Sequence, residues 1–272
     1  MGRREYFTEY QQAEEERLLA QGEVFDPLTR RVFAAAGLAR GMRVLDLGSG
    51  VGNVSRLAAE FVGPEGSVVG VDRDPDAVRR AARLAAAGGQ GTVEFRVGDI
   101  EALTGLDGEF DAVVGRLVLM YLADPAGALR NAASLLRPGG LICMHEADLT
   151  YMWSTVDGPT WRQLRSWIVG VLQGIGADPR MGPSLFATFR AAGLPDPEMR
   201  MEAAVGGGEH APAFGWANIA RVALPLMERA GIATAAEVDP DTLTERLLAE
   251  VHAEHGVVVG PCLYGAWART PG

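Results

Sequence analysis

The stretch Val44-Leu45-Asp46-Leu47-Gly48-Ser49-Gly50-Val51-Gly52 decides the fold. Its apolar residues around one aspartate predict a parallel strand, because such a strand is buried on both faces. The three glycines allow a sharp turn in which a ligand lies against bare backbone. A helix is expected directly afterwards, capped by Asn53 or Ser55, with Leu57 and Phe61 in its apolar stripe. Strand, glycine turn and helix N-terminus together predict a nucleotide-type site.

The spacing of the glycines departs from the dinucleotide pattern G-x-G-x-x-G. The third glycine, Gly52, comes one residue early, and Asn53 stands where that pattern has its last glycine. The pattern D-x-G-x-G-x-G over residues 46–52 resembles motif I of the class I S-adenosylmethionine-dependent methyltransferases. A purely structural turn would show the same glycines, so the later elements must distinguish the two interpretations.

A second strand, Ser67–Asp72, is predicted to end in a carboxylate. Its distance along the chain from the glycine turn suits a strand-helix-strand unit that puts an acid beside a ribose. Asp72 is therefore expected to bind the ribose in a bidentate manner, with Arg73 stacked near the adenine. The alternative is that Asp72 only caps the next helix, a role that Asp74 or Asp76 could also take.

The resemblance continues with a helix over Pro75–Ala87 and a strand over Thr92–Val97. Asp99 and Ile100 follow that strand. In the family, an acid and an apolar residue at this place bind adenine, which implies that Asp99 accepts from the amine and that Ile100 packs on the ring.

The fourth strand is predicted over Phe110–Gly115, with Arg116 to Tyr121 crossing the top of the sheet. The resemblance implies that the Arg116 guanidinium binds the methionyl carboxylate of the cofactor. A helix over Pro125–Leu136, a turn over Arg137–Gly140 and a strand over Leu141–Met144 come next, and "LRPGG" before a strand is a signature of the superfamily.

The resemblance covers roughly residues 40–147 and implies S-adenosylmethionine as the cofactor. The residues expected to bind it are Tyr10, Arg17, Gln21, Asp46, Gly48, Ser49, Gly50, Asn53, Asp72, Arg73, Asp99, Ile100, Arg116 and Tyr121.

Residues 5–21 are predicted to form a helix whose polar residues share one face. Its expected function is a lid over the cofactor, and the alternative is a solvated surface held by charge pairs. A second helix is expected over Pro27–Ala36. The substrate pocket is expected to include Tyr6, Trp153 and His210. Trp161 and its helical neighbours more simply form an amphipathic core.

Strands are also expected over Glu198–Val205 and residues 256–269, with helices at about residues 213–230 and Pro240–His255 between them. Catalysis is assigned to His145 and Glu146 at the end of the fifth strand, where either is a candidate general base. In the alternative interpretation, Glu146 only anchors the cap through hydrogen bonds and His145 fills space beside the strand.

Composition limits the partners. The formal net charge is −10, the sequence pI is about 5.0, and all 25 basic residues are arginine, so lysine is not a candidate base. An acidic chain with no signal-peptide core and no long apolar run is expected to be cytoplasmic, without nucleic acid or membrane partners. Cys143 and Cys262 are expected to be reduced core residues.

These patterns predict an α/β, Rossmann-like, doubly wound sheet of seven strands, mostly parallel with an antiparallel C-terminal strand, plus helical cap insertions. One structural domain is expected, made of lid helices (1–36), a cofactor-binding core (37–147), and the remaining sheet with a substrate cap (148–272) whose insertion spans about residues 209–256. A homodimer is one option for an otherwise open oligomeric state.

The predicted function is methyl transfer from S-adenosylmethionine to a small molecule, in the style of bacterial secondary metabolism. The alternatives are a non-catalytic cofactor-binding module of the same fold and a nicotinamide-dependent oxidoreductase. No metal is expected, because the candidate ligands form no compact motif; they are His145, Glu146, Asp148, His210, His252 and His255.

Overall fold

The computed structural model describes residues 21–22, 24–106, 109–212 and 215–272. The chain divides into two compact units. The sheet unit contains Asp26–Ala147, Arg180–Glu202 and Leu263–Gly272. The helical unit contains Asp148–Pro179 and Ala203–Cys262, together with the described residues up to Phe25. The domain boundaries expected from the sequence stay predictions.

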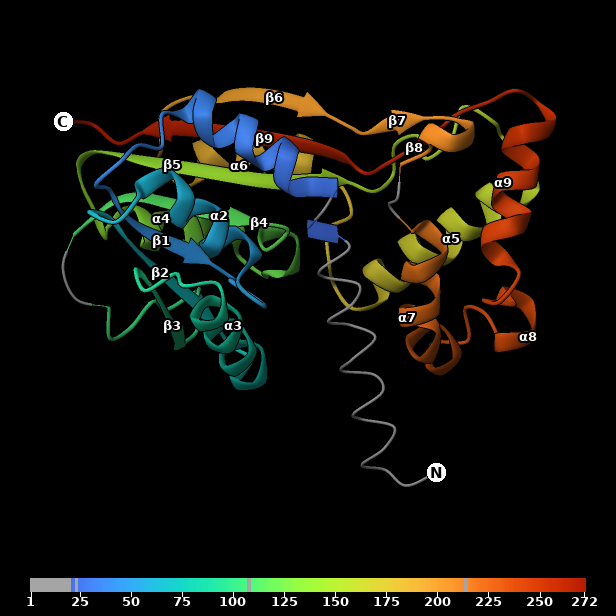
Figure 1. The fold of residues 1–272 in the computed structure, drawn as a ribbon, viewed down its shortest axis with the longest axis horizontal. Helices are drawn as coiled ribbons and strands as arrows, with labels where there is room; N and C mark the ends of the chain where they lie inside the picture. The colour runs from blue at the N-terminus through green and yellow to red at the C-terminus, as the bar shows by residue number, and fades with distance from the viewer. Residues whose placement is uncertain (1–20, 23, 107–108, 213–214) are drawn as a thin grey trace. The chain divides into compact units, whose positions relative to one another are not determined.

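The sheet unit is built on a seven-stranded sheet with the order β3-β2-β1-β4-β5-β9-β6. The strands are β1 (Arg43–Leu47), β2 (Ser67–Asp72), β3 (Val93–Val97), β4 (Phe110–Arg116), β5 (Leu136–Asp148), β6 (Glu198–Glu202) and β9 (Cys262–Arg269). Strands β1 to β5 pair in parallel, and β9 runs antiparallel to β6. In Figure 1 the arrow of β9 also opposes that of β5. The predicted seven-stranded sheet with an antiparallel C-terminal strand is confirmed.

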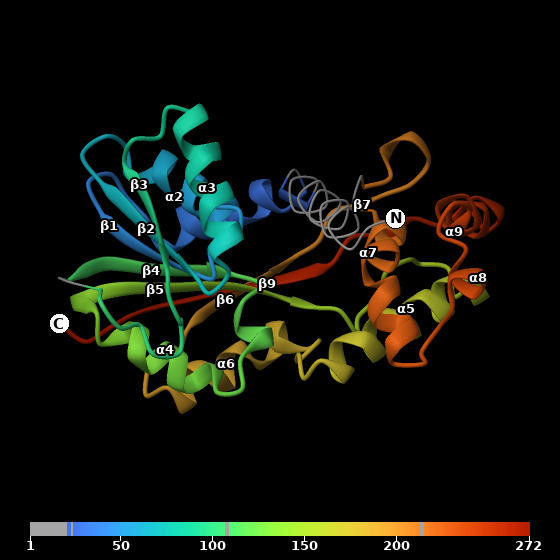
Figure 2. The same ribbon diagram turned by 90° about the horizontal axis from the view of Figure 1, so that it is seen from below.

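Helices cover both faces of this sheet. They are α2 (Asn53–Val62), α3 (Pro75–Ala87), α4 (Pro125–Ala133) and α6 (Met181–Ala191), and η1 (Leu119–Tyr121) is a short 3₁₀ helix. Figure 2 shows α2 and α3 on one face and α4 and α6 on the other. Residues 24–36 are also helical, so the helix expected from Pro27 begins earlier. Val32 of this helix lies so close to Gly265 of β9 that a Cβ there would be 2.6 Å from its Cγ2.

The core beneath α2 joins the sheet to the first helix of the unit. Val44, Val68 and Val114 are fully buried there and pack with Leu57 and Phe33. Phe33 also meets the Phe61 ring edge-on at 5.8 Å. Apolar strands buried on both faces are what a doubly wound parallel sheet requires, because helices cover each side.

The turn predicted over Arg137–Gly140 is wrong, since these residues belong to β5. Helix α4 ends at Ala133 rather than Leu136. Phe110 of β4 pairs with Leu136 of β5, and Ala112 pairs with Leu141. Between these two pairs β5 has more residues than β4, so β5 bulges here. Gly139 takes a φ of 75° in that bulge, which explains why a glycine-rich sequence occurs inside a strand.

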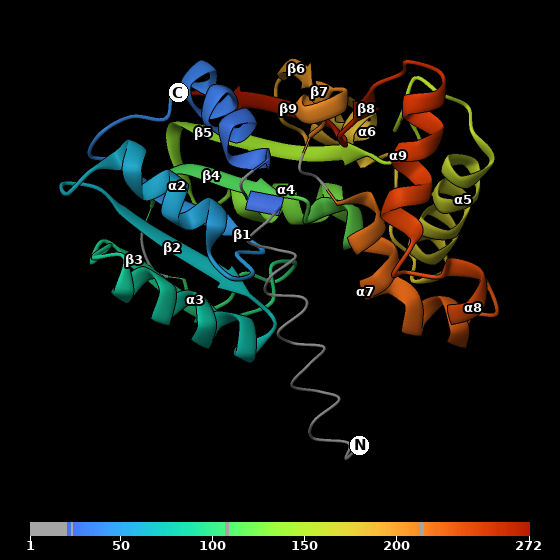
Figure 3. The ribbon, with the colours of Figure 1, turned by 45° about the vertical axis from the view of Figure 1, so that its right-hand side comes forward.

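The helical unit contains α5 (Pro159–Gly174), α7 (Trp216–Arg229), α8 (Ala235–Val238), α9 (Leu243–Ala253), η2 (Gly208–His210) and the short strands β7 (Val205–Gly206) and β8 (Val258–Val259). Helix α5 packs against α7 and α9, as Figure 3 shows. Glu250 of α9 accepts from the backbone amide of Thr160 at 2.9 Å, so it caps α5, whose own N-cap residue is Gly158.

Three sequence-based boundaries in the second half of the chain are wrong. The helix expected over Pro240–His255 begins at Leu243, and Asp239, with a φ of 42°, separates it from α8. The strand expected over Glu198–Val205 divides into β6 and β7. The last strand, expected over residues 256–269, divides into β8 and β9 at Gly260, whose amide donates to the carbonyl of Ala204. Among the described residues, no helix is both long and apolar enough to cross a bilayer.

Candidate active site

The glycine turn after β1 has the backbone that its sequence predicts. Gly48, Gly50 and Gly52 have φ values of 65°, 52° and 84°. A Cβ on Gly48 would lie 2.3 Å from Val118, and one on Gly52 would lie 2.7 Å from Phe95. A Cβ on Gly50 would meet no atom within 4 Å. Packing therefore requires the outer two glycines, and the middle one presents bare backbone to an open space.

Gly52 is the N-cap residue of α2, and no side chain caps this helix. The prediction that Asn53 or Ser55 would do so is wrong. The Oδ1 atom of Asn53 accepts from Arg56 at 2.7 Å, and the Ser55 hydroxyl donates to Asp46 at 2.5 Å. Gly52 brings its backbone close to Phe95, which leaves no room for a capping side chain at this position.

Asp72 organises the turn from the end of β2. Its Oδ2 accepts from the Gly50 amide at 2.8 Å, and its Oδ1 accepts from the Asp74 amide at 2.9 Å. Asp74, not Asp72, caps α3, because its side chain accepts from the Asp76 amide. The half-buried Asp72 carboxylate keeps further lone pairs, which suit the two hydroxyls of a ribose.

Asp46 lies on β1 and is completely buried. Its Oδ2 accepts from the Ser55 hydroxyl, whereas its Oδ1 has no hydrogen-bond partner in the described structure. The Ser49 hydroxyl is likewise buried without a partner there. Burial raises the pKa of Asp46 from 3.8 to about 7, against the opposing influence of Ser55 and Arg116. A cation near Oδ1 would stabilise its charged form.

The remaining predicted adenine contacts lie at the same edge of the sheet. In the parallel pairing, Asp72 stands opposite Val97, two residues before Asp99. Asp99 is exposed and accepts from the Glu101 amide at 2.9 Å, and Ile100 is half-buried. Arg73 is exposed, and Tyr121 on η1 is 48% exposed. These side chains line an edge open to solvent.

Arg116 has protein partners of its own at the end of β4. Its Nη1 lies 2.8 Å from Asp26 Oδ1 and donates to the Thr29 hydroxyl at 2.8 Å. Its side chain is only 6% exposed. This geometry disfavours the predicted role on the methionyl carboxylate, because Asp26 already neutralises the guanidinium.

His145 and Glu146, the predicted bases, are both buried on β5. His145 Nδ1 lies 3.1 Å from the Thr29 hydroxyl. Burial, helped by Arg116, lowers the pKa of His145 from 6.5 to about 3. Glu146 Oε1 accepts from the amides of Val118 and Leu119 at 2.9 and 2.8 Å. The geometry favours a structural role for both residues, as in the alternative interpretation, but Glu146 anchors the backbone of Val118 and Leu119 rather than the cap.

The other predicted residues belong to the helical unit or lie outside the part of the chain that the structure describes. Tyr6, Tyr10 and Arg17 lie outside the described residues, and Gln21 belongs to the helical unit. His210 is exposed on η2. No group of three His, Cys, Asp or Glu side chains suited to a metal occurs in the described part of the chain.

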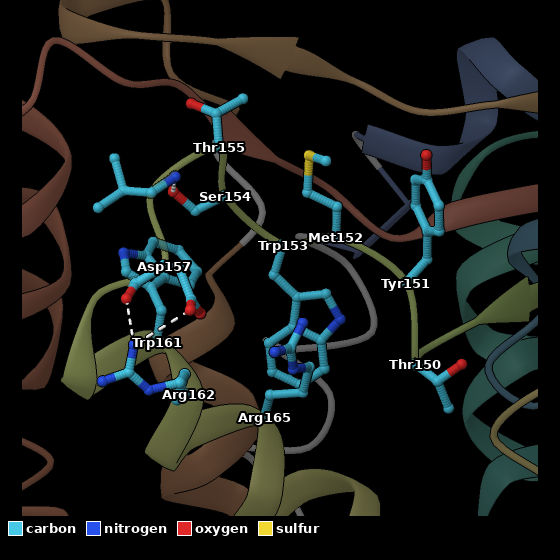
Figure 4. Close-up of a pocket in the computed structure, with 11 residues that line it drawn as sticks. Thr150, Tyr151, Met152, Trp153, Ser154, Thr155, Asp157, Trp161, Arg162 and Arg165 are labelled. Atoms are coloured by element: carbon cyan, nitrogen blue, oxygen red, sulfur yellow. Dashed lines mark hydrogen bonds and ion pairs between the residues drawn. The ribbon is translucent and has the colours of Figure 1, made fainter.

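Trp153 lines a pocket of about 350 Å³ in the helical unit. Its indole is buried and stacks on Trp216 at 3.8 Å. The pocket is formed by the loop after β5 and the first turns of α5, as Figure 4 shows. Its lining residues are Thr150, Tyr151, Met152, Trp153, Ser154, Thr155, Val156, Asp157, Trp161, Arg162 and Arg165.

Sequence reasoning missed Asp26, Thr29, Ser55 and Arg165. Ser55 was considered only as a cap, although it follows Asp46 closely in the motif. Asp26 and Thr29 contact Arg116 although they lie 90 and 87 residues away from it in the sequence. No local sequence pattern predicts contacts over such separations.

Comparisons with known proteins agree with this geometry. A family model described as "Methyltransferase domain" matches residues 38–169. Nocamycin O-methyltransferase of Saccharothrix syringae is 37% identical over 155 residues, which cover 57% of this chain and 51% of that protein. An arsenite methyltransferase of Halobacterium salinarum is 36% identical over 117 residues, which cover 43% and 30%. The chain thus spans about half the length, or less, of these curated relatives.

The fold also matches a solved structure of a protein from Bacillus halodurans. The identity is 18%, the TM-score is 0.59, and the match covers 89% of this chain and 98% of the other. Residues 38–169 thus match a methyltransferase domain, and the solved structure shares the fold. The glycine turn and the acid at the end of β2 lie within the matched residues, and S-adenosylmethionine is the cofactor that this domain implies.

Proposed function

We propose that this protein transfers a methyl group from S-adenosylmethionine to a small organic molecule. The observation that carries the proposal is the turn at Gly50. Its φ of 52°, the open space where a side chain would stand, and its amide bond to Asp72 form a cradle for a nucleoside.

The chain's residues fit the cofactor's chemistry. Asp72 has lone pairs for two ribose hydroxyls, and Asp99 with Ile100 offers an acceptor and an apolar surface to adenine. The unsatisfied Oδ1 of Asp46 suits the positively charged methionyl end. We assign Arg116 to the support of this site through Asp26 and Thr29, rather than to direct contact.

When bound, S-adenosylmethionine supplies a methyl group on a sulfonium, and the sulfur keeps the electron pair of the broken C–S bond. The chain's contribution is to align the acceptor and to exclude water. We propose that neither His145 nor Glu146 takes a proton from the acceptor. His145 is a very weak base with a pKa of about 3, and Oε1 of Glu146 is held by two backbone amides, which ties this carboxylate to the loop after β4.

An organic acceptor is favoured over arsenite by the state of the thiols. Soft thiolates are the ligands that bind a soft inorganic centre. Cys143 and Cys262 are both buried and unpaired with each other. Burial raises the pKa of both thiols, that of Cys262 to about 11. The relative named nocamycin O-methyltransferase supports an acceptor of secondary metabolism.

The test is calorimetry with S-adenosylhomocysteine and with NAD, followed by an assay of methyl donor consumption against a panel of small acceptors. Binding of S-adenosylhomocysteine without NAD binding is expected, with one donor consumed for each product formed. Cofactor binding without turnover on any acceptor would favour a non-catalytic module. Tight binding of NAD alone would contradict the proposal.

A further inference from the structure

The pocket of the helical unit contains a cation that no carboxylate among the described residues neutralises. Arg162 and Arg165 both line it from α5. Arg162 pairs with Asp157, whose Oδ2 lies 3.2 Å from its Nη1. Within the described part of the chain, no hydrogen bond or ion pair involves Arg165, which is half-buried. Among the described residues of the lining, Asp157 is the only acidic one, and it already pairs with Arg162.

A second donor lies in the same wall. The Nε1 atom of Trp153 is buried and has no acceptor among the described residues. Trp161 and Trp216, by contrast, donate to the carbonyls of Leu247 and Val259. Buried donors in native structures are normally satisfied, so an indole N–H without an acceptor calls for a water or a ligand oxygen. Figure 4 shows the Trp153 and Arg165 side chains extending toward one another from the loop and from α5.

The rest of the wall is apolar or aromatic. Tyr151 and Met152 are 48% and 40% exposed, and Trp161 adds a buried aromatic edge. The volume of about 350 Å³ falls in the range of small-molecule sites. An apolar wall beside an unpaired guanidinium is suited to a flat hydrophobic molecule with one anionic group, which arginine binds through two parallel N–H bonds.

We propose that this pocket binds an aromatic carboxylate, with Arg165 on the carboxylate and Tyr151, Met152 and Trp161 around the ring. The pocket lies within the helical unit, and the inference is drawn from the residues of that unit alone. The binding itself is independent of the cofactor and is tested separately from it.

The test is calorimetry on the full chain with 2-naphthoate and its neutral analogue 2-naphthamide. The wild type should bind the acid at least about tenfold more tightly than the amide, as expected when one charged hydrogen-bonded pair distinguishes two ligands. Arg165→Gln should abolish that preference, and Arg165→Lys should restore only part of it. Arg162→Gln is the matched control, because its charge is already held by Asp157, and it should keep the preference.

Equal affinity for acid and amide in the wild type, or an unchanged preference in Arg165→Gln, would overturn the proposal. Absence of 2-naphthoate binding at millimolar concentration would also overturn it. S-adenosylhomocysteine binding is measured in the same samples. If the wild type does not bind S-adenosylhomocysteine, that result counts against the proposed function alone. If it binds S-adenosylhomocysteine but shows no preference for the acid over the amide, the result counts against the pocket proposal alone.

Discussion

The Thr29 hydroxyl lies 3.1 Å from Nδ1 of His145. Thr29 also accepts a hydrogen bond from Arg116, so one hydroxyl connects the guanidinium to the imidazole. The chain of contacts Asp26–Arg116–Thr29–His145 joins the first helix of the sheet unit to the ends of β4 and β5. Burial, together with the nearby Arg116, lowers the pKa of His145 and favours its neutral form.

Thr29→Val should destabilise the protein without impairing the cofactor site directly. The substitution keeps the shape of the side chain but removes the partner of His145 Nδ1 and one of the two acceptors of Arg116 Nη1, at a cost of roughly 1–3 kcal/mol. Urea denaturation measures the loss. Thr29→Ser retains the hydroxyl and should stay close to the wild type. Equal stability of all three proteins would show that the chain of bonds contributes nothing.

The pH dependence of stability should reveal two opposing groups. The folded pKa of His145 is about 3 against 6.5 unfolded, so its contribution is present above pH 6.5 and is lost as the pH falls toward 3. The folded pKa of Asp46 is about 7 against 3.8, so its contribution is present below pH 3.8 and is lost as the pH rises through 7. Between pH 3.8 and pH 6.5, stability therefore rises with pH through His145 and falls with pH through Asp46, so the two effects oppose each other.

When either residue is replaced, the pH dependence of the free energy of unfolding should therefore show the effect of the other residue alone. Relative to the wild type, Asp46→Asn should gain stability as the pH rises from 4.5 to 6.5, by about 1.4 kcal/mol per pH unit. His145→Phe should lose stability relative to the wild type over the same rise. Denaturant titrations at five pH values give the measurement. Parallel curves for the two variants would contradict both pKa assignments.

Cofactor affinity should depend on Asp72 and much less on its neighbour Asp74. Asp72→Ala removes both the expected ribose contacts and the acceptor of the Gly50 amide, and it should weaken binding by roughly 2–3 kcal/mol. Asp99→Ala should cost about 1 kcal/mol through one adenine contact. Asp74→Ala is the control, since it removes the cap of α3 and a contact with Arg80 and should affect stability rather than affinity. Unchanged affinity in Asp72→Ala would refute its assignment to the ribose.

A single-turnover experiment tests whether Glu146 acts as a general base. Glu146→Gln keeps an acceptor for the amides of Val118 and Leu119, so it should fold and lose less than tenfold in rate. A general base would lose about 100-fold or more with binding retained. A loss of that size in Glu146→Gln, with unchanged cofactor affinity, would return catalysis to this residue.

Local patterns predicted much of the sheet unit because its signals are local. Pro75 and the glycines after Ala87 bound α3 as expected, and Ser67–Asp72 is a strand with the same limits. The sequence predicts a turn where β5 in fact bulges at Gly139, because a glycine with positive φ suits either structure. The partner of His145 lies 116 residues away, and sequence periodicity holds no information on such a contact.

The last prediction concerns Gly50 and uses a second glycine as its control. Gly50→Ala should leave the fold intact, because a Cβ there meets no atom within 4 Å, at the cost of roughly 1–2 kcal/mol for a positive φ. Gly139 has a φ of 75° and equally open surroundings, so Gly139→Ala carries the same backbone strain far along the sequence from the turn. Thermal unfolding should place the two variants close together. Calorimetry with S-adenosylhomocysteine should then separate them, with a loss of ~100-fold or more in Gly50→Ala, whose methyl group enters the space assigned to the cofactor, and none in Gly139→Ala. Equal cofactor affinity in the two variants would mean that the open space at Gly50 is not where the cofactor binds.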